Sequence, residues 1–248
     1  MRGRPKIIVT TDGPPFERES VDTFIRIVEN AIRARGRCLL ALSGGETPRS
    51  IYRLLASEAF RGRIEWKHVQ LFFADERTVP PDDPQSNFGM VQRELLSHVP
   101  IPPTNVHRLA GEKDPMAAAS EYERVFREVC GTDEPRLDLV LLGIGEDGHT
   151  ASLFPGTDVL EERTALVRAV AVPSLNTVRL TLTLPVLNGA RSVIVLISGA
   201  RKREVFRRLV HDSGDAGPID LLETLTRDVI LIVDRSASGP EFLTPSRK

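Results

Sequence analysis

One histidine of the chain lies in a setting suited to proton transfer. His149 belongs to residues 141–150, LLGIGEDGHT, in which an apolar run is followed by glycines and a carboxylate. An unperturbed imidazole titrates near pH 6.5, about where it can both accept and return a proton at neutral pH. We therefore predict that His149 is a general base and that Asp147 orients it. The other histidines are predicted to be structural, namely His68, His98, His107 and His211.

The same loop fits two nucleotide-binding patterns, and neither explains it well. Gly143, Gly145 and Gly148 match G-x-G-x-x-G, but Pro155 and the glycine after it limit any following helix to about two turns. Residues 143–150 also lie one substitution from a phosphate-binding G-x-x-x-x-G-K-T loop, with His149 in place of the lysine. An imidazole cannot replace that permanent cation. No nucleotide cofactor and no metal is therefore predicted.

A second segment, residues 72–80 (FFADERTVP), carries charge at the end of an apolar run. Charges in such a place can simply face water. Here the prolines at 80, 81 and 84 stiffen the chain that follows, so the segment is suited to holding Asp75 and Arg77 in place. We expect Asp75 to orient Arg77, and Arg77 to be available for a negatively charged group.

A third segment, residues 42–48 (LSGGETP), runs from an apolar stretch through two glycines to Thr47 and a proline, the pattern of a capped helix start. Glycines allow close approach of a ligand, and the amides at a helix N-terminus favour an anion. The segment is compatible with a phosphate cradle and equally with an ordinary tight turn. The candidate ligand-binding residues from the two glycine loops are Ser43, Gly44, Gly45, Thr47, Gly145 and Gly148.

The apolar runs of the sequence predict the strands and helices that position these three segments. Strands are predicted at 7–10, 38–42, 69–74, 137–142, 167–172, 193–197 and 229–233. Between them an apolar helical stripe from Val21 to Ile32 ends at Gly36, a second helix is predicted to start at Thr47 and a third after Asp114. Strands alternating with helices predict an α/β fold with three layers, α/β/α, and a mostly parallel, Rossmann-like sheet that binds ligands beyond the carboxyl ends of its strands. We expect one domain over residues 1–248.

The composition excludes several classes of function. Of the residues, 41% are hydrophobic and the formal charge is -1, so no global field attracts nucleic acid or an anionic membrane. Cys38 and Cys130 match no metal-binding spacing and are expected to be buried thiols rather than a disulfide. No stretch is long and apolar enough for a signal peptide or a membrane span, and we expect a cytoplasmic protein.

The three segments together, SGGETP, FFADERTVPPDDPQSN and LGIGEDGHTASLFPG, resemble the 6-phosphogluconolactonases, which share a fold with the glucosamine-6-phosphate deaminases. The resemblance extends over residues 7 to about 233 and includes RLTLT at 179–183 and SGARK at 198–202. It implies that His149 is the general base and that the SGG amides, Arg179 and Lys202 bind the 6-phosphate of a sugar. It is weaker over 218–238, where Ile219 replaces the usual alanine and the last strand lacks a tryptophan.

The resemblance also separates the two activities. In the deaminases the sequence around the histidine is GHIAFNEP, which has a catalytic glutamate at the position of Phe154 in this chain. The deaminases also have Asp-Glu-Tyr where this chain has Asp-Glu-Arg, so that their tyrosine corresponds to Arg77. Losing a carboxylate and gaining a guanidinium favours stabilising negative charge at an ester over moving protons on an amino sugar. Hydrolysis of 6-phospho-D-glucono-1,5-lactone is therefore the expected activity.

Two alternatives stay open, a deaminase or isomerase of an amino-sugar phosphate and a non-catalytic regulator that binds a sugar phosphate. In the expected reaction, His149 takes a proton from water and returns it to the departing ring oxygen, while Arg77 or backbone amides of the glycine loops face the oxyanion. The expected partner is a small sugar phosphate, without nucleic acid or membrane, and the expected assembly is a monomer or weak homodimer.

Overall fold

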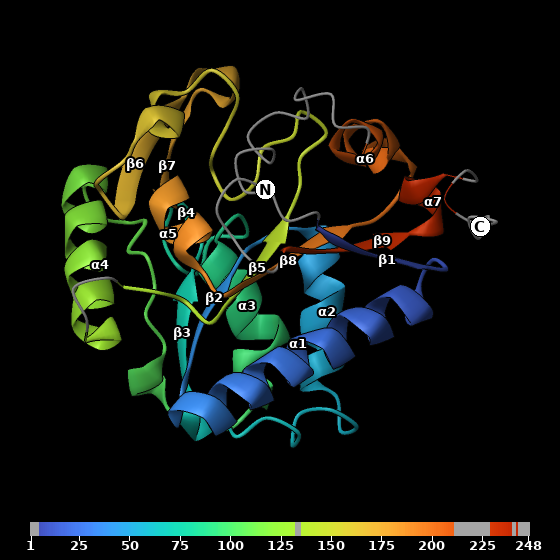
Figure 1. The fold of residues 1–248 in the computed structure, drawn as a ribbon. Helices are drawn as coiled ribbons and strands as arrows, with labels where there is room; N and C mark the ends of the chain where they lie inside the picture. The colour runs from blue at the N-terminus through green and yellow to red at the C-terminus, as the bar shows by residue number, and fades with distance from the viewer. Residues whose placement is uncertain (1–4, 132–134, 211–228, 240–241, 243–248) are drawn as a thin grey trace.

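The computed structural model describes residues 5–131, 135–210, 229–239 and 242, which form a large and a small β-sheet with helices packed around them (Figure 1). The strands are β1 (Lys6–Thr10), β2 (Cys38–Leu42), β3 (Val69–Phe73), β4 (Asp75–Arg77), β5 (Leu139–Gly143), β6 (Val167–Val172), β7 (Thr177–Leu182), β8 (Ser192–Ile197) and β9 (Val229–Asp234). The α-helices are α1 (Pro14–Arg35), α2 (Glu46–Ala56), α3 (Asn87–Glu94), α4 (Pro115–Cys130), α5 (Leu184–Gly189), α6 (Arg203–Val210) and α7 (Arg235–Ser238).

The central sheet has six parallel strands in the order β1-β9-β8-β5-β2-β3. Every residue of β2 and of β9 is buried, because helices and loops cover a parallel sheet on both faces and leave no side of the strand for polar residues. The expected α/β fold with a mostly parallel sheet is therefore confirmed. The strands predicted for this sheet are confirmed with shifts of one or two residues at their ends.

The strand order reverses between β2 and β5. After β2 the chain moves outward to β3, whereas after β5 it moves the other way, through β8 to β9. The two strands pair only at Leu40–Leu139 and Ala41–Val140, so their pairing stops before their carboxyl ends. Loops that leave neighbouring strands in opposite directions open a crevice between them, which is where open α/β sheets bind ligands.

The small sheet corrects the sequence analysis. The segment predicted to be a strand at 167–172 exists as β6 but pairs antiparallel with β7, which was not predicted, and β7 pairs antiparallel with β4. The run predicted as one strand at 69–74 ends at Phe73, and the acidic residues after it form β4 rather than a loop. Ala74 joins the sheets, since its N–H donates to the Leu42 carbonyl and its carbonyl accepts from the Leu182 N–H.

The predicted helix ends are partly right. The stripe of α1 is buried and the helix stops at Gly36, whose left-handed backbone (φ 73°) closes the last turn. Asp114 caps α4 by accepting from the Ala117 N–H at 2.9 Å. Thr47, however, does not cap α2: the helix begins at Glu46 after Gly45, which gives the chain its sharp entry with φ 108°. Residues 144–157, which include the histidine loop, form turns rather than a helix.

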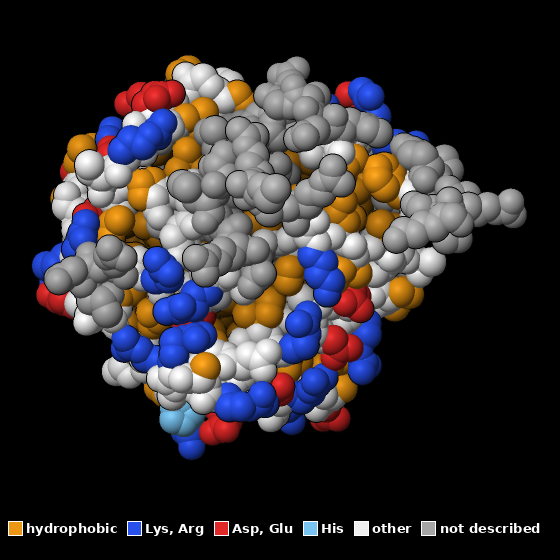
Figure 2. Space-filling view, in the orientation of Figure 1, with side chains coloured by type: hydrophobic (Ala, Val, Ile, Leu, Met, Phe, Trp, Pro, Cys, Tyr) orange, Lys and Arg blue, Asp and Glu red, His pale blue; other side chains and the backbone are white. Residues whose placement is uncertain are grey.

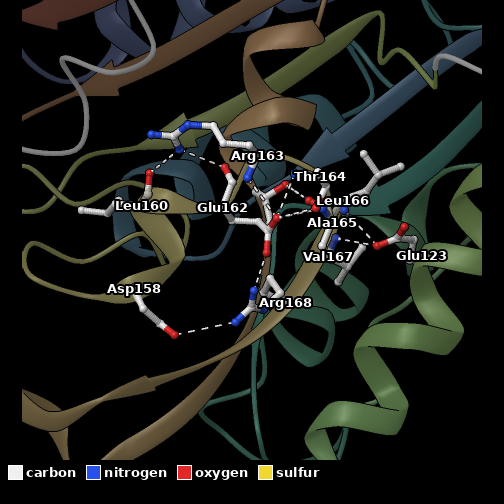
Figure 3. A network of polar contacts seen from close by, with 11 residues as sticks. Glu123, Asp158, Leu160, Glu162, Arg163, Thr164, Ala165, Leu166, Val167 and Arg168 are labelled. Carbon is white, nitrogen blue, oxygen red and sulfur yellow. Dashed lines mark hydrogen bonds and ion pairs between the residues drawn. The ribbon is translucent and has the colours of Figure 1, made fainter.

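Two acidic side chains hold the segment that leads into β6 (Figure 3). The Glu162 carboxylate accepts from the N–H groups of Arg163, Thr164 and Ala165 and pairs with Arg168. On the neighbouring helix α4, Glu123 accepts from the N–H groups of residues 166 and 167. The small sheet is thereby fastened to α4, against which β6 and β7 also pack.

The two cysteines are found as expected from the sequence. Cys38 and Cys130 are buried free thiols, and burial raises the pKa of the Cys130 thiol to about 11. No helix in the described ranges has the length and apolar character needed to cross a membrane. Figure 2 shows Lys and Arg side chains on the lower part of one face with Asp and Glu side chains among them, consistent with a formal charge of -1.

Candidate active site

A cleft of about 810 Å³ lies beyond the carboxyl ends of the central strands, at the β2–β5 crevice. Its walls come from the loops after β2, β5 and β8, from β4 and β7 of the small sheet, and from the β6–β7 turn at 174–175. The cleft brings together eleven of the twelve predicted site residues, namely Ser43, Gly44, Gly45, Thr47, Asp75, Arg77, Gly145, Asp147, His149, Arg179 and Lys202. Gly148 does not line it.

The loop after β5 folds back on itself and presents His149. The Gly145 N–H donates to the His149 carbonyl at 2.7 Å, and the Gly148 N–H donates to the Gly145 carbonyl at 3.1 Å. Gly145 has to be glycine, because a Cβ there would lie 2.1 Å from the His149 Nδ1. Both glycine amides are used inside the turn. That Gly145 and Gly148 bind a ligand stays a prediction.

His149 and Asp147 form a directed pair. The Asp147 Oδ1 lies 2.6 Å from the His149 Nδ1 and also accepts from the His149 N–H at 3.1 Å. Burial opposes ionisation of Asp147, but these hydrogen bonds from His149 outweigh it and lower the pKa of the carboxyl. An ionised carboxylate only accepts, so Nδ1 carries the proton and Nε2 is the basic nitrogen. With 32% of its side chain exposed, His149 is open to the cleft.

Two guanidinium groups stand side by side on the small sheet. Arg77 of β4 and Arg179 of β7 are directly paired across the strands, and both line the cleft. Burial, and then the charge of Arg77, lower the pKa of Arg179, and its Nε has no hydrogen-bond partner among the described residues. Like charges directly opposite each other are unfavourable. The pair therefore forms a local positive field suited to an anion.

The loop after β2 places small groups and helix amides opposite these arginines. Gly44 packs so closely against Asn87 that a Cβ on it would lie 1.8 Å from the Asn87 Oδ1. The Ser43 Oγ is buried and has no partner among the described residues. The first amides of α2 have no acceptor within the helix, and residues 45–48 line the cleft. This arrangement is consistent with the phosphate cradle of the sequence analysis.

Asp75 has a different role from the one predicted. Its buried carboxylate accepts from the Asn87 Nδ2 at 3.1 Å and from the Ser152 Oγ at 2.7 Å. The prediction that Asp75 orients Arg77 is wrong here, because the Arg77 guanidinium donates instead to the Gln85 carbonyl. Asp75 ties the start of α3 to the histidine loop. Sequence reasoning missed Asn87 and Ser152, since neither position signals a contact with Asp75.

Glu76 points away from Arg77 and fixes α3. Its carboxylate accepts from the N–H groups of Arg77, Asn87 and Phe88 and from the Ser86 hydroxyl. Burial raises the pKa of Glu76 against the opposing effect of these hydrogen bonds. The short strand thus places alternate side chains on opposite sides, with the arginine toward the cleft and the glutamate toward the helix.

Lys202 reaches the cleft from the loop after β8. Buried Asp234 at the end of β9 accepts from the Ser198 hydroxyl and from the Gly199 N–H, which shapes the turn leading to Lys202. Burial lowers the pKa of Lys202, with Glu146 opposing that effect. A half-buried ammonium of this kind is stabilised when an anion binds beside it. Asp234 was not identified from sequence.

The other predicted features lie outside this centre. His107 stacks on Phe72 and lies 2.8 Å from the Gln70 side chain, whereas His68 and His98 are at the surface. None of the three lines the cleft, while His211 lies outside the described residues. Of the divergent segment 218–238, only 229–238 is described. Within the described ranges no group of three or more His, Cys, Asp or Glu side chains is placed to hold a metal ion.

Comparison with known proteins places this geometry in a family. Residues 15–231 match the family model described as glucosamine-6-phosphate isomerases/6-phosphogluconolactonase. A 6-phosphogluconolactonase from Nostoc is 38% identical over 211 residues, 84% of this chain and 85% of that protein. One from Rattus norvegicus is 38% identical over 207 residues, 82% of this chain and 80% of the relative.

A solved structure supports the same assignment. The 6-phosphogluconolactonase from Trypanosoma cruzi has a TM-score of 0.87 and 30% identity, with 99% of each chain covered. The likeness therefore extends over both sheets as well as the three motif segments. The chain belongs to the glucosamine-6-phosphate isomerase/6-phosphogluconolactonase family.

Proposed function

We propose that this protein hydrolyses 6-phospho-D-glucono-1,5-lactone to 6-phosphogluconate. The observation that carries the proposal is the combination, in one cleft, of the Asp147–His149 pair with the positively charged Arg77, Arg179 and Lys202. A base next to an anion-binding wall suits an electrophilic substrate that carries a phosphate. The named relatives at 38% identity are 6-phosphogluconolactonases, which supports the choice of substrate.

The phosphate would be held away from the reacting carbonyl. Arg179, Lys202 and the first amides of α2 supply donors from three separate segments, and the unpartnered Arg179 Nε and Ser43 Oγ would gain a hydrogen bond on binding. An unpartnered buried polar atom is costly, so an anion that satisfies it binds with a gain. Anchoring the phosphate then positions the ring carbonyl near His149.

The chemistry needs one base and one group facing the oxyanion. The His149 Nε2 takes a proton from water as the water oxygen bonds to the lactone carbonyl carbon, giving a tetrahedral oxyanion. The oxyanion collapses, the bond from that carbon to the ring oxygen breaks, and the imidazolium returns the proton to the ring oxygen. Asp147 stabilises the imidazolium in between, and Arg77, which lines the same cleft, is the proposed oxyanion donor.

Replacing His149 with alanine tests the proposal. Acid release from freshly prepared lactone, measured above the spontaneous rate, is expected to show kcat lower by about 10²–10⁴ with little change in KM. His68→Ala is a matched control, because His68 is partly exposed and outside the cleft. A His149→Ala variant with wild-type kcat would remove His149 as the base.

The same preparation distinguishes the alternatives. A deaminase would release ammonia from glucosamine 6-phosphate, and a regulator would bind 6-phosphogluconate without lactone turnover. Phe154 stands where the deaminases have a glutamate, and the cleft contains Arg77 where they have tyrosine. Lactone turnover without ammonia release is therefore the expected outcome. A cytoplasmic location and a monomeric or weakly dimeric state remain predictions.

A further inference from the structure

An aromatic ring lies flat against the candidate base. The ring centroids of Phe154 and His149 are 4.2 Å apart with an interplanar angle of 25°, so the rings are stacked. Phe154 itself is partly buried and packs against the hydrophobic core, which holds it in place. It also lines the cleft. The stack therefore connects the core of the protein to the imidazole.

The imidazole is restrained by three kinds of contact. Asp147 holds the Nδ1 at 2.6 Å, and the backbone of Gly145 lies against the edge formed by Nδ1 and Cε1. A hydrogen bond alone leaves the ring free to turn about the axis through Nδ1. The aromatic face of Phe154 restricts that rotation, because turning the imidazole out of the stack would lose the face-to-face contact between the two rings.

We propose that Phe154 is a positioning residue that fixes the plane of the His149 ring and directs its Nε2 toward the substrate. The proposal rests on the proposed function for its kinetic consequence, but the ring geometry stands apart from it. The phenylalanine side chain has no titratable group and cannot exchange a proton with the imidazole. In the described structure, Asp147 is the one carboxylate in hydrogen-bond contact with the His149 ring. Proton exchange with the cleft is thereby confined to Nε2.

The effect on turnover follows from this orientation. A base contributes only when its nitrogen lies within hydrogen-bond reach of the proton that it removes. If the ring samples other planes, fewer bound complexes are productive, while the distant phosphate contacts are unchanged. Loss of the stack should therefore lower kcat by about tenfold and leave KM within about twofold.

Leucine and tyrosine at this position form the test. Phe154→Leu keeps an apolar side chain but removes the aromatic face, whereas Phe154→Tyr keeps the face. We expect the leucine variant to lose about tenfold in kcat and the tyrosine variant to stay within about threefold of wild type. Phe60→Leu is the control, because Phe60 is a buried aromatic packed under Arg18 and Arg63, outside the cleft. It should leave kcat unchanged.

A spectroscopic measurement separates this proposal from the lactonase assignment. Nitrogen-15 NMR of the full chain reports which ring nitrogen carries the proton, and the His149 signals are assigned by their loss in His149→Gln. In wild type and Phe154→Tyr the Nδ1-protonated form should predominate, with ring protons shifted upfield by the stacked ring. In Phe154→Leu the upfield shift should vanish and the preference for Nδ1 should weaken.

The outcomes are distinct. Wild-type kcat together with an unchanged tautomer in Phe154→Leu overturns the positioning role. If Phe154→Tyr loses as much kcat as Phe154→Leu, the positioning role is also overturned, because a variant that keeps the aromatic face should keep most of its kcat. If the wild-type protein shows no lactone turnover but the NMR differences appear as described, the proposed function fails and the ring-positioning role stands.

Discussion

At the scale of single residues, the cleft contains cationic side chains that are not paired with acidic side chains among the described residues in the way that several surface arginines are. Several exposed arginines on the helices have acidic partners three or four residues away, as Arg124 has Glu128 at 2.6 Å. Arg179 instead faces Arg77, and its Nε has no partner among the described residues. Such an arrangement costs stability in the empty protein. Under the proposed function this cost is offset when the phosphate binds, and that binding would account for the convergence of these cations.

Replacing Arg179 with alanine tests this explanation. We expect KM for the lactone to rise by about tenfold or more with kcat nearly unchanged, because in the proposed function Arg179 contacts the phosphate in both the ground state and the transition state. Steady-state kinetics gives both constants. Arg191→Ala, an arginine outside the cleft, is the comparison variant. An unchanged KM in Arg179→Ala would take Arg179 out of the binding site.

At the scale of elements, the site depends on short segments locked together by buried polar contacts. Asn87 at the start of α3 donates to the Asp75 carboxylate and packs directly on Gly44 of the loop after β2. Asp75 in turn reaches Ser152 in the histidine loop. One asparagine and one aspartate therefore set the relative positions of three loops that are far apart in the sequence.

Gly44→Ala should disturb this packing. The added Cβ would lie 1.8 Å from the Asn87 Oδ1, so the loop or the asparagine must move, at a cost of about 1–3 kcal/mol. The cost should be smaller in an Asn87→Ala background, where the obstructing amide is missing. Urea unfolding of the four proteins of this cycle measures the coupling. Strictly additive changes in unfolding free energy would show that the two residues do not interfere.

The Glu162 network makes a second prediction for an element. Hydrogen bonds from the Thr164 and Ala165 N–H groups lower the pKa of Glu162 from 4.5 to about 2. A pKa that is lower in the folded state stabilises the protein above the pKa of the unfolded state, and the gain is lost as the pH falls toward the folded value. Glu162→Gln should therefore lower Tm near neutral pH, and the difference from wild type should shrink below about pH 4.5.

Thermal unfolding between pH 2 and 7 measures that difference. Glu161→Gln is a close control, because the Glu161 side chain is 84% exposed and pairs only loosely with Arg163 at 3.4 Å. It should show little effect on Tm at any pH. A Glu162→Gln difference that stays constant as the pH falls would contradict the role of the ionised carboxylate.

At the scale of the whole molecule, the cleft joins two sheets with different strand directions. The central sheet supplies loops from the carboxyl ends of β2, β5 and β8, and the small antiparallel sheet supplies Arg77 and Arg179. A ligand that touches both sheets couples them and stabilises the fold as a whole. Binding to the native state alone at about a hundred times Kd contributes about 2.7 kcal/mol.

Product binding should show this coupling. With 6-phosphogluconate at about a hundred times its Kd, Tm should rise by about 5–10 °C for a chain of this size. Gluconate, which lacks the phosphate, should give a far smaller rise at the same concentration, and Arg179→Ala should reduce the response to 6-phosphogluconate. Equal rises with gluconate and 6-phosphogluconate would argue against recognition through the phosphate.

The sequence by itself determined the central sheet and singled out most of the predicted site residues that the structure brings to one cleft. Buried parallel strands form near-continuous apolar runs, and His149 follows Gly148 in the glycine-rich loop at the end of such a run, so both are visible locally. That the chain forms one domain remains a prediction. The sequence analysis did not find the antiparallel sheet, because the direction in which a short strand pairs depends on a distant partner and not on its own pattern.

Tertiary structure alone decided which contacts each site residue makes. Asp75 lies two residues from Arg77, yet it bonds to Asn87 and Ser152, while Arg77 is brought opposite Arg179 across the small sheet. The amides of Gly145 and Gly148, which the motif made available, are used to close the turn. Polar groups in a buried setting take the partners that the fold brings within about 3 Å, and proximity in sequence does not determine those partners.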